Sequence, residues 1–335
     1  MIDLSNFNSL FAIAQYFNSR EICMQTIIES RWGVGEEQDV ICPKCGHHHC
    51  KRSSSKDDRF TCNHCKYRFS ALVGTIFENT KVSLVKWFMA MYLIACHKKG
   101  ISSYQLAKDC AMTQKSAWYI LHKVRTLFAQ SDSPQLRGNV EVDEMYLGGR
   151  EKNKHANKHV EGTQGRSTKA KAAIFGMAER NVYKDRYGNE HVYYIVRAMH
   201  IGDSKASTLL PIIDQFVAKG SHIVTDEANV YAGLTKMGYT HSIVNHSEKE
   251  FSKGGGITTN GIEGFWGHFK RMVLGTYHFV SKKHLQAYID EAAYRWNTTR
   301  EKPEYLFPDL FALSLGIVRY ETITIKQGCS IANVA

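Results

Sequence analysis

Proline is scarce in this chain, with five among 335 residues, and no apolar run approaches the ~20 residues that a membrane-spanning helix needs. The first residues, MIDLSNFNSLFAIAQYF, lack the basic start and the small-residue cleavage site of a signal peptide. We therefore expect a cytosolic protein without a membrane span. Together with a hydrophobic fraction of 43%, the low proline content favours a globular chain over a disordered one.

Acidic residues are also too few to balance the basic ones. The chain has 32 Asp and Glu against 43 Lys and Arg, which gives a formal net charge of +11. A surplus of this size favours a polyanionic partner, and nucleic acid before a membrane surface. Charge alone leaves open a merely basic soluble protein.

Nine cysteines is an odd number, and four of them form two C-x-x-C pairs, Cys42 with Cys45 and Cys62 with Cys65. In a chain without a secretory signal, this spacing predicts a metal site rather than disulfides. Four thiolates complete the tetrahedral shell of a structural zinc and leave no position for water, so we expect this zinc to support folding and not catalysis. We interpret the nearby donors as bystanders, although one of them can replace a thiolate: His47, His48, His49, Cys50 and His64.

Changes in pattern along the chain predict several domains. We expect an N-terminal helical segment at 1–37, a β-rich zinc ribbon at 38–72 and a helical DNA-binding domain at 80–130. An α/β domain follows at 138–300, and a C-terminal extension at 301–335, where YETITIKQG is typical of a strand.

The helical segment SSYQLAKDCAMTQKSAWYILHKVRTLF resembles a helix-turn-helix. Its second helix begins near Gln114, so Gln114, Lys115 and Ser116 are predicted to meet DNA bases or phosphates. The alternative is an ordinary helical hairpin with a polar face. The adjacent zinc ribbon and the basic charge favour DNA binding.

Beyond residue 138 the periodicity changes to that of strands. The order is three strands, a helix, a strand, and then further elements, which is the order of a ribonuclease-H-like core, an α/β sheet covered by helices. We expect strands at 139–147, 170–179, 190–199, 222–225 and 241–245. Helices are expected at 203–218, near 228–237 and around Glu263.

Residues 149–171 carry seven Lys or Arg against two Glu and little hydrophobic content, so this segment is predicted to be a loop. The pattern is equally typical of a solvated insertion and of an arm that contacts the DNA backbone.

Three carboxylates are placed where they can converge. Asp143 closes the run NVEVDEMYLGG, Asp226 ends SHIVTDEANVY, and Glu263 lies on the later helix. Carboxylates suit a divalent metal, and Lys270, two turns beyond Glu263 on the same helix face, can reach a phosphate. Such a site suits phosphodiester chemistry.

Taken in order, these pieces resemble the ISXO-like DDE transposases of bacterial insertion sequences. The resemblance covers about residues 20–300 and rests on ICPKCG, TCNHCKYRFS, VDEMYLGG, VTDEANVY and TNGIEGFWGHFKR. It implies a multidomain protein with a zinc ribbon, a helix-turn-helix and a ribonuclease-H-like catalytic domain.

The same resemblance implies Mg²⁺-dependent cleavage and strand transfer at the terminal inverted repeats of an element. Asp143, Asp226 and Lys270 match the family's positions, whereas the third acidic position falls on Asn260 or Glu263. A carboxylate binds a hard cation better than an amide does, so we favour Glu263, with Asn260 as a second ligand or helix cap.

On this interpretation two Mg²⁺ ions are held by Asp143, Asp226 and Glu263, and Arg271 joins Lys270 at a phosphate. Double-stranded DNA is the expected partner, as element ends and as target. The paired ends require at least a homodimer, acting at the nucleoid of the cell. A catalytically inactive DNA-binding regulator is the alternative, and a nuclease without strand transfer is a third option.

Overall fold

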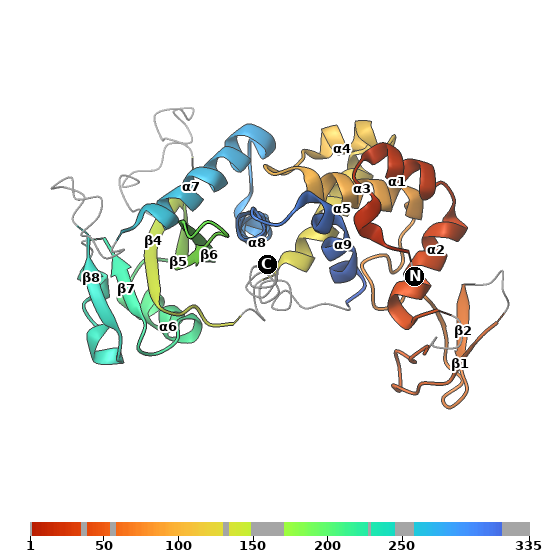
Figure 1. Ribbon diagram of the computed structural model, residues 1–335, viewed down its shortest axis with the longest axis horizontal. Coiled ribbons are helices and arrows are strands. Elements are labelled where there is room, and N and C mark those ends of the chain that lie inside the picture. The colour runs from red at the N-terminus through yellow and green to blue at the C-terminus, as the bar shows by residue number, and fades with distance from the viewer. Residues whose placement is uncertain are drawn as a thin grey trace, which may run out of the picture. The chain divides into compact units, whose positions relative to one another are not determined.

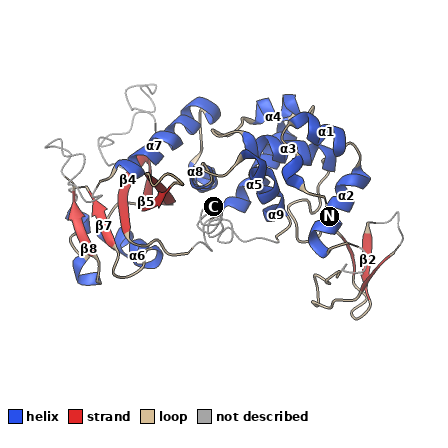
Figure 2. Cartoon of the chain, in the orientation of Figure 1, coloured by secondary structure: helices blue, strands red, loops and turns tan. Residues whose placement is uncertain are grey.

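The computed structural model describes residues 2–34, 39–53, 58–129, 134–148, 171–226, 229–244 and 258–316. These residues form two compact units. The first consists of residues up to Phe128 together with those from Arg300, and the second of residues 129–299. Helices dominate the first unit, and the second is built on a sheet (Figures 1 and 2).

All but the last of the described α-helices in the first unit begin at hydroxyl caps. Ser9, Ser19, Ser83, Ser102 and Thr113 each accept a hydrogen bond from a backbone N–H in the first turn, which satisfies a donor that would otherwise lack a partner. The helices are α1 (Leu10–Tyr16), α2 (Arg20–Trp32), α3 (Leu84–Cys96), α4 (Ser103–Asp109), α5 (Gln114–Arg125) and α9 (Pro303–Ser314).

Aromatic packing around α3 forms the core of this unit. The Phe88 ring lies 4.5 Å from that of Phe17 and 5.1 Å from that of Phe311, and Tyr92 contacts Phe307. Helix α9, from the predicted C-terminal extension, therefore packs in the same core as α1 and α3. The strand expected in YETITIKQG lies outside the described residues.

The zinc-ribbon segment is β-rich, as predicted. Three short strands form an antiparallel sheet in the order β1 (Cys50–Arg52), β2 (Arg59–Cys62) and β3 (Arg68–Ser70). Trp32 at the end of α2 packs on this sheet through the rings of Phe60 and Phe69. A small apolar cluster thus supports the ribbon beside its metal ligands.

The second unit has one mixed sheet of five strands in the order β6-β5-β4-β7-β8. β5 (Ala172–Lys184) pairs antiparallel with both β4 (Asn139–Leu147) and β6 (Glu190–Ile201). β7 (His222–Thr225) is parallel to β4 and to β8 (Thr240–Ile243). All five predicted strands are present.

Helices cover both faces of this sheet (Figure 1). On one face α7 (Asn260–Met272) and α8 (Leu285–Asn297) enclose a core with Ile174, Ala178 and Val196. On the other, α6 (Ala206–Phe216) encloses a second core with Val140 and Phe175. Within β4, Met145 belongs to the first core and Val140 to the second, because successive side chains of a strand point to opposite faces of the sheet.

One predicted element is wrong. The helix expected near 228–237 is replaced by two 3₁₀ turns, Asn229–Tyr231 and Thr235–Met237. Gly233 lies between them, and Gly238 ends the second with a φ of +88°. Two glycines so close together weaken a helix, because glycine loses more conformational freedom than any other residue when it becomes helical.

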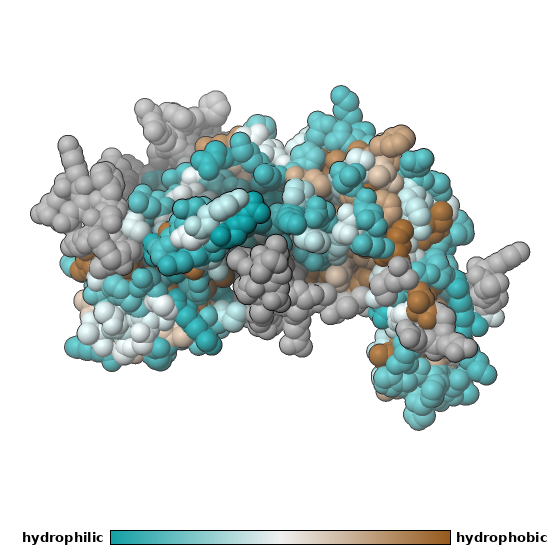
Figure 3. All heavy atoms as spheres, viewed as in Figure 1, coloured by the Kyte–Doolittle hydropathy of each residue, from teal (hydrophilic) through white to brown (hydrophobic). Residues whose placement is uncertain are grey.

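None of the helices among the described residues is long and apolar enough to cross a membrane. The face shown in Figure 3 is mostly hydrophilic, with hydrophobic residues in scattered small areas.

Candidate functional site

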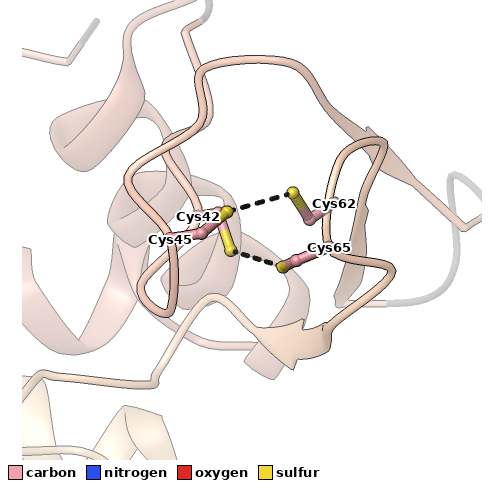
Figure 4. Close-up of side chains that lie close together, drawn as sticks. All are labelled: Cys42, Cys45, Cys62 and Cys65. Atoms are coloured by element: carbon pink, nitrogen blue, oxygen red, sulfur yellow. Dashed lines mark hydrogen bonds between the residues drawn. The ribbon is translucent and has the colours of Figure 1, made fainter.

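The four cysteines of the two C-x-x-C pairs gather at one point. The Sγ atoms of Cys42 and Cys65 are 3.6 Å apart, those of Cys45 and Cys62 are 3.7 Å apart, and all four lie within 4.8 Å of one another (Figure 4). Tetrahedral zinc with Zn–S bonds of about 2.3 Å requires Sγ atoms about 3.8 Å apart. The quartet therefore fits a structural zinc.

The pKa values within the quartet are shifted in opposite directions, to about 6 for Cys62 and to about 12 for Cys45. Burial opposes ionisation of Cys62, yet the backbone N–H groups of Cys65 and His64 donate to its sulfur and lower its pKa to about 6. Two of the nearby donors have contacts of their own, since His48 Nδ1 lies 2.6 Å from Asp39 Oδ2 and Cys50 Sγ lies 3.8 Å from His47 O. That the nearby donors are bystanders stays a prediction.

Asp143 on β4 and Asp226 at the end of β7 lie side by side across the parallel register of the two strands. The parallel register pairs Val140 with Ile223 and Glu141 with Val224. Two residues further, the same register sets Asp143 beside Asp226, which directly follows β7. Neighbouring strands are about 4.8 Å apart, so the two carboxylates emerge side by side.

The electrostatics of Asp143 reflect this crowding. Burial, with the negative charges of Glu144 and Asp226, raises its pKa to about 7 against the hydrogen bonds that it accepts. One of these comes from Trp266, whose Nε1 donates to Asp143 Oδ2 at 2.9 Å. A divalent cation would relieve the repulsion between the carboxylates, because it favours their ionised forms.

Helix α7 lies against the sheet at this point because two glycines allow a close approach. Gly176 pairs with Asp143 across β4 and β5, and a Cβ there would lie 2.6 Å from the Trp266 ring. A Cβ on Gly261 would lie 2.2 Å from the Tyr194 ring. Side chains at either position would push the start of α7 away from Asp143.

A buried carboxylate that the sequence did not single out also holds α7. Glu141 is 1% exposed, and its Oε2 accepts a 3.0 Å hydrogen bond from the Ile262 N–H. Burial raises its pKa to about 7. Its position two residues before Asp143 puts both side chains on one face of β4, and that period-two spacing was the available signal.

The remaining predicted residues lie along α7. Asn260 and Glu263 are exposed in its first turn, and Glu263 Oε1 accepts a 3.0 Å hydrogen bond from Thr259 Oγ1. Lys270 and Arg271 are exposed in its last turn. Within the described ranges, the cysteine quartet is the one set of three or more donors close enough together to hold a metal, so Glu263 is not gathered with the two aspartates.

The predicted DNA-contacting residues begin α5. Gln114 Nε2 donates to Ser103 Oγ at 2.8 Å, which joins α5 to α4, and the Ser116 N–H donates to Thr113 Oγ1. Lys115 is exposed. Trp118 and Tyr119, exposed by 41% and 36%, follow one turn later. The basic segment 149–171 lies outside the described residues, apart from Lys171.

Comparison with known families gives two matches. Residues 135–297 match the model of the ISXO2-like transposase domain, and residues 18–68 match the transposase zinc-ribbon domain. The first match contains Asp143, Asp226 and α7, and the second contains the cysteine quartet.

Individual proteins are similar as well. An uncharacterized protein in transposable element ISH50 of Halobacterium salinarum is 28% identical over 82% of this chain and 89% of its own length. An uncharacterized transposase-like protein of Haemophilus influenzae is 32% identical over 34% of this chain and 86% of its own. A solved Mos1 strand transfer complex aligns over 71% of this chain and 77% of its own, at 10% identity and a TM-score of 0.26.

Proposed function

Since this chain belongs to the ISXO2-like transposases, we propose that it binds the ends of a mobile DNA element and catalyses metal-dependent strand cleavage and strand transfer there. The substrate is double-stranded DNA, first as the terminal inverted repeats and then as the target. The supporting observation is the level placement of Asp143 and Asp226 on adjacent parallel strands.

The fold of the second unit supports this proposal. Three antiparallel strands are followed by two strands parallel to the first, with helices on both faces of the sheet, and this order supports the proposed ribonuclease-H-like domain. In open α/β sheets, sites form where parallel strands end. Asp226 stands at such an end, with Asp143 beside it.

Magnesium is the proposed catalytic metal, because carboxylate oxygens suit a hard cation that keeps several waters. Asp143 and Asp226 would hold it, with Glu263 or Asn260 from α7 as the third ligand. When bound, a pair of such ions activates water or a 3′-hydroxyl and neutralises charge at phosphorus.

The chain's own residues orient the reaction. Trp266 fixes one oxygen of Asp143, and Glu141 holds the first turn of α7 to the sheet. Lys270 and Arg271 lie two turns beyond Glu263, where they bind a phosphate of the DNA near the reacting bond.

End recognition is proposed for the first unit. The zinc ribbon and the pair α4 and α5, as a helix-turn-helix, bind the element end, with Gln114, Lys115 and Ser116 at the DNA. The net charge of +11 supports this partner. Two ends are brought together by a homodimer or larger assembly, in the cytoplasm at the nucleoid.

A strand-cleavage experiment tests the proposal. A labelled duplex that carries the element end is incubated with the protein and Mg²⁺, Mn²⁺ or no divalent metal. We expect nicks at the element boundary with either metal and none without. Binding without cleavage under all three conditions would favour the inactive regulator, and cleavage without joining to target DNA would favour a nuclease.

A further inference from the structure

An apolar pocket of about 490 Å³ lies in the second unit, where β4 ends and the chain leaves α7. Its walls are mainly aliphatic, and an aromatic ring stands at its edge. The lining includes Leu147, Val273, Leu274, Phe279, Val280 and Leu285. None of these residues is among those that hold the proposed catalytic metal.

The segment between α7 and this pocket has a strained backbone. Val273–Tyr277 is a π-helical turn, and His278 follows with φ +60° and ψ −41°. The Phe279 N–H donates to Tyr277 O at 2.6 Å, which closes a three-residue γ-turn of the rare positive-φ type. Strain of this kind persists only where the surroundings impose it, and it is concentrated at functional sites.

The turn displays two hydrophobic side chains. Phe279 is 79% exposed and Leu274 is 67% exposed. Helix α8 holds the turn in place. Tyr277 OH donates to Glu291 Oε1 at 2.8 Å, and Glu291 forms a buried ion pair with Arg295. The exposure of Phe279 is therefore a built feature of the turn.

The segment that forms most of the pocket wall is basic. From Gly264 to Ile289 the sequence contains no acidic residue, but four Lys or Arg and three His. Lys270 and Arg271 are exposed at the end of α7, Lys283 is exposed beyond the turn, and Lys282 and His278 line the pocket. A hydrophobic pocket with an exposed aromatic ring and nearby basic side chains suits a nucleotide, because the faces of the base stack on aromatic rings and the phosphate is an anion.

The pocket is within reach of DNA held at Asp143. Asp143 and Leu147 are four residues apart on β4, or about 13 Å. Glu263 and Val273 are ten residues apart on the helix, or about 15 Å. A DNA strand advances about 3.4 Å per nucleotide, so the pocket lies about four nucleotides from a phosphate at the aspartates.

We propose that this pocket receives an unpaired base of the DNA, with the base against Phe279 and its phosphates on the basic rim. The inference rests on the proposed function, since it takes the DNA to lie at Asp143 and Asp226. It adds a distinct subsite, in which the protein recognises a base that has left the duplex near the reacting phosphate.

Binding of three duplexes by the full-length protein, without divalent metal, tests this subsite. One 30-base-pair duplex is fully paired, the second carries a single extra thymine as a bulge, and the third carries an abasic bulge at the same place. We expect the protein to prefer the thymine bulge over the abasic bulge by about five-fold or more, because stacking on a protein ring stabilises a bound base by that much.

Variants assign the preference to the ring. Phe279→Ala should bind the two bulges equally and keep its affinity for the paired duplex, whereas Phe279→Trp should restore the preference. Tyr187→Ala is the matched control, since Tyr187 is a 73% exposed aromatic on the β5–β6 hairpin of the same unit. Thermal unfolding of each variant checks folding.

The proposal is overturned if the wild type does not distinguish the two bulges, or if Phe279→Ala still does. Because no metal is present, this outcome is separate from the cleavage assay. A preserved base preference in a protein that never cleaves would instead refute the proposed function and leave the pocket as a binding site.

Discussion

The indole Nε1 of Trp266 donates a 2.9 Å hydrogen bond to Oδ2 of Asp143, and so ties the middle of α7 to the middle of β4. The contact exists because Gly176, opposite Asp143, leaves room for the indole. It favours the ionised carboxylate, while burial and the neighbouring charges of Glu144 and Asp226 oppose ionisation. The position of α7 and the protonation of Asp143 are thus linked through one side chain.

Replacing this donor should change the pH profile of cleavage. Trp266→Phe keeps most of the bulk but loses the hydrogen bond, which is worth about 1.5 kcal/mol or more to a charged acceptor. The pKa of Asp143, already raised to about 7, should rise by about one unit. Activity requires the ionised form, so the acid limb of the profile should move to higher pH. Trp296→Phe is the control, because the Trp296 ring packs on Phe265, and it should leave the acid limb of the pH profile in place. An unshifted acid limb in Trp266→Phe would show that the hydrogen bond does not set the pKa of Asp143.

Glu141 should make the stability of the second unit depend on pH. Its pKa is raised from 4.5 to about 7 in the folded protein, so the folded state holds a proton that the unfolded state has released. Stability should therefore be highest below pH 4.5 and fall as pH rises towards 7, by up to about 3 kcal/mol. Glu141→Gln removes this ionisation, so its stability relative to the wild type should improve from pH 5 to pH 8.

Thermal unfolding at several pH values, without added magnesium, measures this difference. Glu190→Gln serves as the control, because Glu190 is an exposed glutamate in the same sheet. A constant gap between wild type and Glu141→Gln across the range would show that Glu141 is ionised throughout.

The zinc site yields a prediction with an internal control. Purified protein should contain about one zinc per chain, and Cys42→Ser or Cys65→Ser should lose it and unfold the ribbon while the second unit keeps its structure. Cys50→Ser should retain zinc, because Cys50 lies outside the quartet. Mass spectrometry measures the zinc content of each variant. If Cys50→Ser loses as much zinc as Cys42→Ser, the zinc has a different set of ligands.

Gln114 and Lys115 should make different contacts with DNA, Gln114 to a base and Lys115 to a phosphate. Gln114→Ala should weaken discrimination between element ends and random DNA by about 1–3 kcal/mol, as the loss of a base contact does. Lys115→Ala should weaken binding to both and reduce the salt dependence by about one phosphate contact. Competition binding over a salt series measures both quantities. Since Gln114 also joins α5 to α4 through Ser103, the helix content of Gln114→Ala is checked first. An unchanged ratio of specific to random binding would move the reading role to another part of the chain.

The sequence predicted the elements that carry a strong period and missed those that depend on neighbours. Alternation identified β4 and β7 and predicted that Asp143 and Asp226 can converge, whereas the parallel register that sets them side by side came from the structure. Glu141 was missed because the same alternation does not tell which face of a strand a helix will cover. The covering helix α7 comes about 120 residues later.

Local chemistry explains the other differences. The helix expected near 228–237 failed because Gly233 and Gly238 favour turns over a continuous helix. The exposed turn at Phe279 was not predicted, because a positive φ at His278 is imposed by the anchoring of Tyr277 and has no signature in composition.

Single substitutions test whether Asp143 and Asp226 form a catalytic metal centre. Cleavage of a labelled element end with Mg²⁺ is measured for Asp143→Asn, Asp226→Asn, Glu263→Gln and Asn260→Ala, alongside binding of the same DNA. We predict that both aspartate variants cleave at least about a hundred-fold more slowly while binding is nearly unchanged. Glu263→Gln should behave like them and Asn260→Ala should be milder; the reverse order would assign the third position to Asn260. Cleavage at the wild-type rate by Asp143→Asn or Asp226→Asn would contradict the account.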